Sequence, residues 1–209
     1  YCAVPSKGFS EEYWAEKAAT EIGCNLNIVT YTPSDYIKAF KFIQNKLPKD
    51  IRSPSSVVHY LVFKNIKEDG FKVVLEGQGA DEIFAGYLHS EIRFWLHCLF
   101  KLKFNNLRII SKKIFSHNLI SDIWLLFISE FIRLKWFKMQ FNDINRNVYE
   151  DPLPSLVKYG DLVSMLSSIE SRNPFLDHNL YEYAFNQNDN DRFLKGASKK
   201  DIRKLLNDY

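Results

Sequence analysis

The sequence is poor in the residues that define several protein classes. It has three cysteines, Cys2, Cys24 and Cys98, and no two of them are close in sequence, so neither a disulfide framework nor a zinc site is indicated. We therefore expect the protein in the reducing cytoplasm. Its 28 basic and 25 acidic side chains leave a net charge of only +3, which by itself does not indicate a nucleic-acid partner.

Long apolar runs are also missing. The most apolar stretch, residues 119–132, is short and contains Asp122 and Glu130, and no charged and then apolar leader opens the chain. The sequence therefore predicts no membrane span. A first residue that is not methionine, and a helical pattern after residue 200 without a stop signal, predict that both ends are cut.

What the chain does have is enough apolar surface for a substantial core. Of its 209 residues 46% are hydrophobic and 15% are aromatic, which predicts one large domain or a domain with an added lobe.

Extended and helical patterns alternate over residues 1–87. We expect strands at residues 2–4, 26–31 and 71–75, the last of them buried. Between them, helices are expected from Ser10 to Gly23, from Pro33 onward, and from a cap at Ser55 or Ser56 to about residue 70. Strands separated by such helices predict a parallel α/β sheet with helices on both faces, and ligands bind such sheets at the carboxyl ends of the strands.

From residue 88 onward the pattern indicates helices and no strand. Residues 91–140 contain nine Lys or Arg and three Asp or Glu, a local excess of six by subtraction. Two interpretations remain open: a solvated basic face on core helices, or a surface for an anionic partner or a membrane.

The most informative stretch is residues 72–87, which indicates a strand, a glycine-rich turn and a helix start. Gly77 and Gly79 would let the backbone turn sharply and approach a ligand, and the free amides of the helix start would bind a phosphate. Asp81 and Glu82 would repel that phosphate unless a cation such as Mg²⁺ lay between them. The sequence thus predicts a Mg²⁺–nucleotide site, with ordinary helix capping as the alternative.

Three motifs in order give a family resemblance. Residues 75–87 resemble the asparagine synthetase signature Leu-Ser-Gly-Glu-Gly-Ala-Asp-Glu-Leu-Phe-Gly-Gly-Tyr. Residues 170–177 resemble the family's Glu-x-Arg-x-Pro-Phe-Leu-Asp, and Gly196, Lys199 and Arg203 reproduce its Gly-x-x-Lys-x-x-x-Arg spacing. The chain is therefore similar to a truncated fragment of the C-terminal synthetase domain of glutamine-hydrolysing asparagine synthetases.

The resemblance implies a fold and a domain organisation. Residues 1–87 would form part of a parallel-sheet, Rossmann-like core of the adenine nucleotide alpha hydrolase type, and residues 88–209 an all-helical lobe that includes the motifs at 170–177 and 196–203. The family's Ser-Gly-Gly-x-Asp-Ser phosphate loop should lie upstream of Tyr1, because the chain has eight glycines and no two are adjacent. An N-terminal glutaminase domain should precede it, and Cys2 is not the nucleophile of that domain because it follows Tyr1.

The resemblance also implies an activity. ATP and Mg²⁺ would convert aspartate to β-aspartyl-AMP, from which ammonia released from glutamine displaces AMP. These 209 residues alone should have neither glutaminase activity nor normal ATP affinity. By similarity, Glu76 and Gly77 would contact the nucleotide within a turn that includes Gly79 and Glu82, and Asp81 would hold Mg²⁺ and pyrophosphate.

Three further residues are candidates for catalysis. Gln78 stands at the family's acid–base position, usually Glu, and an amide cannot accept a proton, so water or another carboxylate does this or Gln78 only orients the intermediate. Lys199 would lie in a first helical turn capped by Ser198, where a cation either meets an anion or is simply solvated. Arg172 could bind phosphate or a substrate carboxylate, or pair with Asp177 to shape the intervening turn.

Other functions stay open at this stage. A related adenylating amidotransferase could use another carboxylate acceptor, and a non-catalytic remnant could serve assembly or binding. The implied partners are aspartate, glutamine or ammonia and the upstream glutaminase domain, with no nucleic acid and a homodimer left open.

Overall fold

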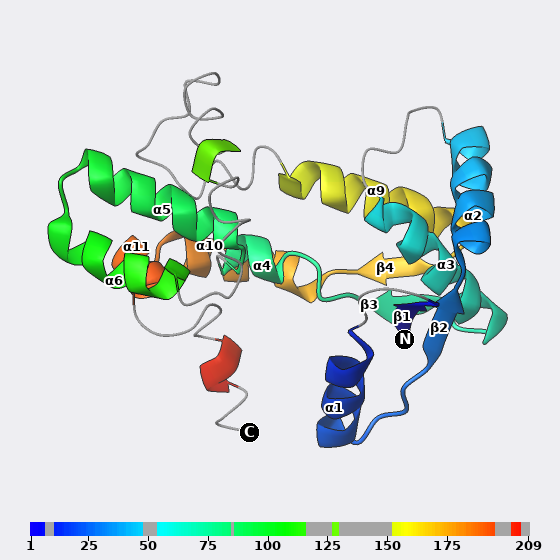
Figure 1. Ribbon diagram of the computed structural model, residues 1–209. Helices are drawn as coiled ribbons and strands as arrows, with labels where there is room; N and C mark the ends of the chain where they lie inside the picture. Colours follow the sequence, from blue (N-terminus) through cyan, green and yellow to red (C-terminus); the bar gives the residue numbers. More distant parts are fainter. Residues whose placement is uncertain are drawn as a thin grey trace. The chain divides into compact units, whose positions relative to one another are not determined.

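The computed structural model describes residues 1–6, 11–47, 54–84, 86–115, 127–129, 152–194 and 202–205 (Figure 1). The chain divides into two compact units, residues 1–76 with 155–172 and residues 77–154 with 173–209. The boundary expected at residue 87 therefore lies inside the second unit. The chain passes from one unit to the other within two of the sequence motifs, after Glu76 and after Arg172.

The first unit contains two pairs of parallel strands. β1 (Cys2–Pro5) pairs with β2 (Ile28–Tyr31), and β3 (Val73–Leu75) pairs with β4 (Glu170–Arg172). Short parallel strands joined by helices make this a mixed α/β structure, which confirms the expected class at that level.

β4 contradicts the expectation that no strand follows residue 87. Its three residues, Glu-Ser-Arg, carry no apolar alternation, and they are extended because each lies opposite a residue of β3. The expected burial of β3 is also wrong. Val73 and Leu75 are 44% and 74% exposed, and only Val74 packs against the helical core of this unit.

Local signals set the helix ends of the first unit. α1 (Glu12–Ile22) ends at Gly23, which has φ +73°, as the sequence predicted, whereas the expected cap Ser10 lies outside the described residues. α2 (Pro33–Lys46) starts at Pro33 as expected, and Thr32 and Asp35 form a capping box before it. The expected serine cap of α3 (Ser55–Glu68) is wrong, because Ser55 and Ser56 lie inside the helix after Pro54.

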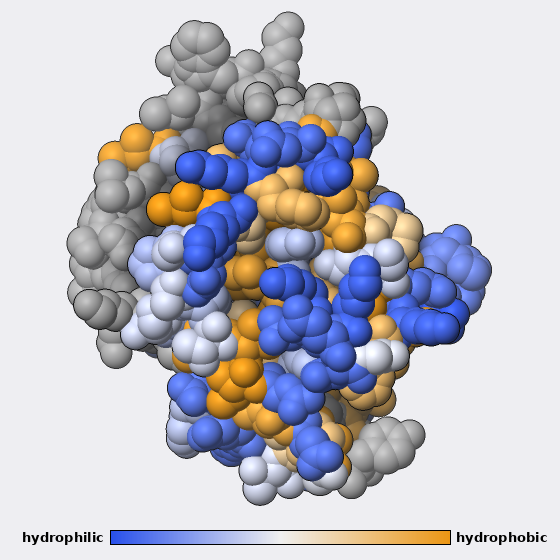
Figure 2. All heavy atoms as spheres, turned by 90° about the vertical axis from the view of Figure 1, so that its right-hand side faces the viewer, coloured by the Kyte–Doolittle hydropathy of each residue, from blue (hydrophilic) through white to orange (hydrophobic). Residues whose placement is uncertain are grey.

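The core of the first unit joins α2, α3 and α9 (Pro152–Leu166). Ile43 and Val57 are fully buried there, and burial of each such side chain contributes about 1.5–3 kcal/mol. The cluster consists of Ala39, Ile43, Val57, Phe63, Ile66, Val163 and Ile169. Part of the apolar surface stays outside, as the hydrophobic patches between hydrophilic residues in Figure 2 show for one face.

The second unit is helical in its described residues. It contains α4 (Ala80–Ile83), α5 (Leu88–Phe100), α6 (Phe104–Phe115), the 3-10 turn η1 (Pro174–Leu176), α10 (His178–Phe185) and α11 (Asp189–Phe193). A buried ion pair of 2.8 Å between Lys113 Nζ and Glu91 Oε1 joins α5 and α6. His97 is buried and its ring stacks on Phe94. None of the described helices is long and apolar enough to cross a membrane.

Candidate functional site

The signature motif starts at the end of a strand in the first unit. β3 ends at Leu75, and the next amide, Glu76 N–H, donates to the carbonyl of Arg172 at the end of β4, at 2.8 Å. The carboxyl ends of the two parallel strands therefore lie at the same edge, where ligands bind in α/β sheets. The first half of the 170–177 motif thus runs beside the strand that leads into the signature.

Gly79 explains why the turn needs a glycine. Its φ of +96° is disfavoured for other residues, and a Cβ at this position would lie 2.3 Å from Leu176 Cδ2. The second half of the 170–177 motif therefore packs directly on the turn. Gly79 thus leaves space for Leu176, and its expected contact with a ligand stays a prediction. A Cβ on Gly77 would have no atom within 4 Å, so of the two glycines in this turn Gly77 is the one with open space beside it.

One apolar cluster joins the three motifs in the second unit. Ile83 and Phe84 from the signature are buried together with Ala184 of α10. Leu176 from the second motif and Ile202, which precedes Arg203 of the third, pack against them. Residues from all three motifs, which lie far apart in the sequence, therefore pack in the same apolar cluster. Lys199, with Gly196 and Ser198, lies outside the described residues.

The two acidic residues of the signature have different surroundings. Glu82 is only 3% exposed, and its Oε1 accepts a hydrogen bond of 2.7 Å from the Tyr87 hydroxyl. Burial, and then this hydrogen bond, raise the pKa of Tyr87, so the hydroxyl keeps its proton and remains a donor. Asp81 is only half-buried and is therefore the carboxylate that a ligand could reach.

The expected Mg²⁺ and phosphate binding can be compared with the described side chains. They contain no group of three or more His, Cys, Asp or Glu that could hold a metal ion. Proteins usually bind Mg²⁺ through one or two carboxylates, while water and phosphate oxygens complete its coordination shell. Asp81 alone therefore fits an ion that is also bound by a phosphate, but not an ion bound by protein side chains only. α4 is a single turn of four residues, so the dipole that it could offer to a phosphate is small.

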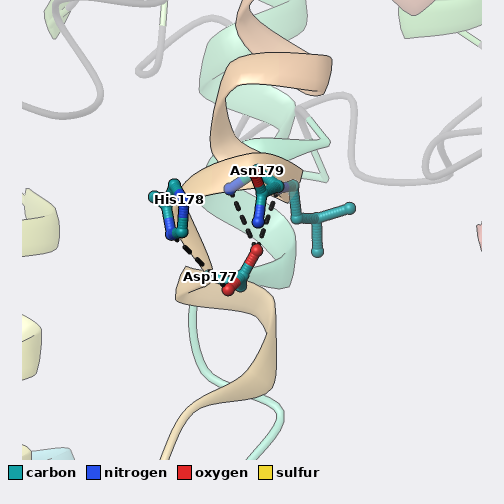
Figure 3. A network of polar contacts seen from close by, with 4 residues as sticks. Asp177, His178 and Asn179 are labelled. Carbon is teal, nitrogen blue, oxygen red and sulfur yellow. Dashed lines mark hydrogen bonds and ion pairs between the residues drawn. The ribbon is translucent and has the colours of Figure 1, made fainter.

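Arg172 and Asp177 each have a local hydrogen-bond partner. Arg172 Nε donates to Glu170 Oε1 at 2.7 Å, and both side chains are exposed. Asp177 caps α10, where its Oδ1 accepts from the amides of Asn179 and Leu180 at 2.9 and 3.4 Å (Figure 3). Each side chain thus has a partner within a few residues of itself, and the pair of Arg172 with Asp177 stays a prediction.

The cap at Asp177 gives a pH prediction. Hydrogen bonds from Asn179 and Leu180 hold the pKa of the carboxyl below its ordinary value. The charge therefore stabilises the fold above the unfolded pKa of about 4, and this contribution is lost as the pH falls through the lower folded pKa. We expect Asp177→Asn to lower the melting temperature at pH 7 and to differ less from wild type below about pH 4. Asp161→Asn, at an exposed aspartate of α9, is the control, and a difference that is independent of pH would contradict the account.

The surroundings of the cysteines bear on their reactivity. Cys2, Cys24 and Cys98 are all free thiols. Burial, as the largest cause, raises the pKa of the Cys2 thiol, which disfavours the thiolate needed for nucleophilic attack.

Comparison with known proteins decides the family. Residues 2–209 match the family model for asparagine synthase. The chain belongs to the asparagine synthase family. A curated relative, "Asparagine synthetase [glutamine-hydrolyzing] 3" from Bacillus subtilis (strain 168), is 26% identical over 227 aligned residues, which cover 93% of this chain and 34% of the relative. The chain thus spans about a third of the length of that asparagine synthetase, and no solved structure matches it.

Two features of this asparagine synthase family site were missed at the sequence level. The contact of Leu176 with Gly79 and the hydrogen bond between Tyr87 and Glu82 both join residues inside the recognised motifs. Their place in the motifs marked these residues as candidates. It did not predict which of their side chains contact one another.

Proposed function

We propose that the chain is the synthetase part of an ATP-dependent amidotransferase that makes asparagine from aspartate through β-aspartyl-AMP, with ammonia from glutamine. The observation that carries this proposal is the packing of three family motifs on one cluster behind a glycine turn that leaves Asp81 half-buried. The family match and the name of the relative support it.

The proposal includes parts outside this sequence. A glutaminase domain and the Ser-Gly-Gly-x-Asp-Ser phosphate loop would lie upstream of Tyr1. We propose that the strand before that loop joins the two strand pairs of the first unit into one Rossmann-like sheet. The exposure of Val73 and Leu75 supports this, because parallel strands are normally covered on both faces.

Within the site, each residue has one proposed task. Asp81 would hold Mg²⁺ together with phosphate oxygens, Glu76 and Gly77 would contact the nucleotide, and Lys199 would face the phosphates from the other side. Bound Mg²⁺–ATP would supply the phosphorus that the substrate carboxylate attacks and the pyrophosphate that leaves. Glu82 is buried and hydrogen-bonded to Tyr87, so it would stabilise the shape of the turn. Asp81 would then be the carboxylate that contacts the ligand.

Gln78 gives a direct prediction about proton transfer. In the full-length protein, Gln78→Glu would introduce a proton acceptor at the family's acid–base position. We expect synthetase activity equal to wild type or up to about 100-fold greater, which is the lower end of what a general base contributes. The measurement is asparagine formation with ammonia as the nitrogen source. A clear loss would show that the amide has its own role, for instance in orienting the intermediate.

Gln78 also favours a second candidate function. An enzyme that keeps the adenylation step but uses another carboxylate acceptor would need different proton transfer at this position. A remnant without catalysis is the remaining alternative, and the coding sequence upstream of Tyr1 separates it. A Ser-Gly-Gly-x-Asp-Ser loop behind a cysteine-headed domain supports an enzyme, and a start codon close to Tyr1 supports the remnant.

The experiment that tests the proposed function is pyrophosphate release by the full-length protein with ATP, Mg²⁺ and a panel of carboxylic acids. Release that depends on aspartate supports asparagine synthesis. Release with a different acid supports the second candidate, and a folded protein that releases pyrophosphate with none of them contradicts both.

A further inference from the structure

The corner between α5 and α6 exposes apolar and basic side chains together. Phe100, Leu102 and Phe104 are 53%, 67% and 69% exposed, and the exposed Lys101 and Lys103 lie between them in sequence. Large apolar side chains that are exposed next to one another mark an interaction surface more often than single ones do. We call residues 100–104 and the outward face of α6 the basic corner.

Leu102 is an unusual residue for its backbone position. α5 ends with hydrogen bonds from Leu102 N to Leu99 O and from Lys103 N to Cys98 O, the Schellman pattern, in which the residue at this point is left-handed and usually glycine. The same pattern ends α1 and α3, where the residues are Gly23 and Gly70. Leu102 has φ +52°, which is disfavoured for a leucine. The chain thus keeps an exposed leucine where glycine would fit the backbone better.

The outward face of α6 continues the same chemistry. Leu107, Ile110 and Ile114 of α6 face the core of the second unit. Residues three and four apart on a helix share a face, and the exposed residues follow that spacing on the other side. They are Phe104, Arg108, Ile109, Lys112 and Phe115.

The charge of this surface has one sign. The sequence has no Asp or Glu between Glu91 and Asp122, whereas Lys101, Lys103, Arg108 and Lys112 all lie on the basic corner. The pair of Lys113 with Glu91 is the ion pair seen at α6. Lys101, Lys103, Arg108 and Lys112 take part in none of the ion pairs seen between described residues.

We propose that the basic corner binds the surface of an anionic membrane. The phosphates of acidic lipids meet the lysines, and the hydrocarbon just below them takes Leu102 and the two phenylalanines. A duplex nucleic acid accepts an apolar side chain only at the cost of unstacking its bases, whereas lipid hydrocarbon accepts it without such a cost. The proposal uses no residue of the candidate nucleotide site, so it stands or falls independently of the proposed function.

The first test is sedimentation of the full-length protein with vesicles of phosphatidylcholine, with and without added phosphatidylglycerol. Binding to the anionic vesicles only, and weaker binding at higher salt, is expected. Lys101→Gln with Lys103→Gln should weaken that binding about 30-fold, because each lysine near an anionic surface contributes a factor of about five. Lys41→Gln with Lys46→Gln, which removes two exposed lysines from α2, is the matched control and should leave binding unchanged.

The second test separates binding from folding. Asparagine tolerates the left-handed region, so Leu102→Asn should melt at the wild-type temperature or above it, and should bind anionic vesicles at least about tenfold more weakly. Ile22→Asn removes an apolar side chain that is 75% exposed on α1 and is the control. Wild-type binding by Leu102→Asn, or equal wild-type binding to both vesicle types, overturns the proposal. A dimer that Leu102→Asn dissociates also overturns it, because the corner would then be a protein interface.

Discussion

The substitution Asp81→Asn in the full-length protein is expected to abolish aspartate-dependent pyrophosphate release and to leave the fold intact. Asn has nearly the shape of Asp, and position 81 is half-buried, so the substitution demands little repacking. What it removes is the charge that would hold Mg²⁺ against the phosphates. Stabilisation of a reaction by a metal amounts to several kcal/mol, so the rate should fall by about 1000-fold or more.

The matched control for Asp81→Asn is Asp161→Asn on α9, which removes one carboxylate from an exposed helical position. Both variants should unfold at the wild-type denaturant concentration, and only Asp81→Asn should lose activity. Unchanged pyrophosphate release would remove Asp81 from the metal site.

Gly79→Ala is expected to have the largest effect on stability. The left-handed backbone at Gly79 disfavours a side chain by about 1–2 kcal/mol, and overpacking against Leu176 adds about 1–3 kcal/mol. The free energy of unfolding should therefore fall by about 2–5 kcal/mol in denaturant titrations. Gly77→Ala is the matched control, because its added methyl group meets no atom within 4 Å and its backbone is not left-handed. Equal losses for the two variants would contradict the packing described for the turn.

A second substitution separates the two causes at Gly79. Leu176→Ala removes the atoms that the new methyl group would strike and leaves the backbone strain unchanged. The double variant should be more stable than the sum of the two single losses predicts, since neighbouring substitutions that share a contact are not additive. If the two losses in the free energy of unfolding were strictly additive, a contact between the side chain added at position 79 and Leu176 would be excluded.

Much of the fold was readable from local sequence. Pro33 predicted where α2 starts, and Gly23 predicted where α1 ends, because helix ends depend on a few neighbouring residues. β4 was not readable, since three polar residues become a strand only through pairing with β3, about a hundred residues earlier. Because β4 pairs with β3, the first half of the second motif lies in the first unit.

The candidate site shows a similar limit. The motifs identified Asp81 and Glu82 as acidic neighbours, but successive residues of a helix point about 100° apart, and charge alone did not show which one faces inward. The structure buries Glu82 on Tyr87 and leaves Asp81 half-buried. The sequence correctly predicted that the turn requires a glycine at position 79. It did not predict that Leu176 excludes a side chain there, because Leu176 lies in a different motif.

We propose that Asp81 and Lys199 together bind a magnesium-bridged polyphosphate. The most direct test is calorimetric binding of pyrophosphate to the full-length protein, with and without Mg²⁺, for wild type, Asp81→Asn and Lys199→Ala. We expect Lys199→Ala to weaken binding about tenfold or more under both conditions, and Asp81→Asn to weaken it only when Mg²⁺ is present. Wild-type affinity in either variant, with Mg²⁺ present, would contradict the account.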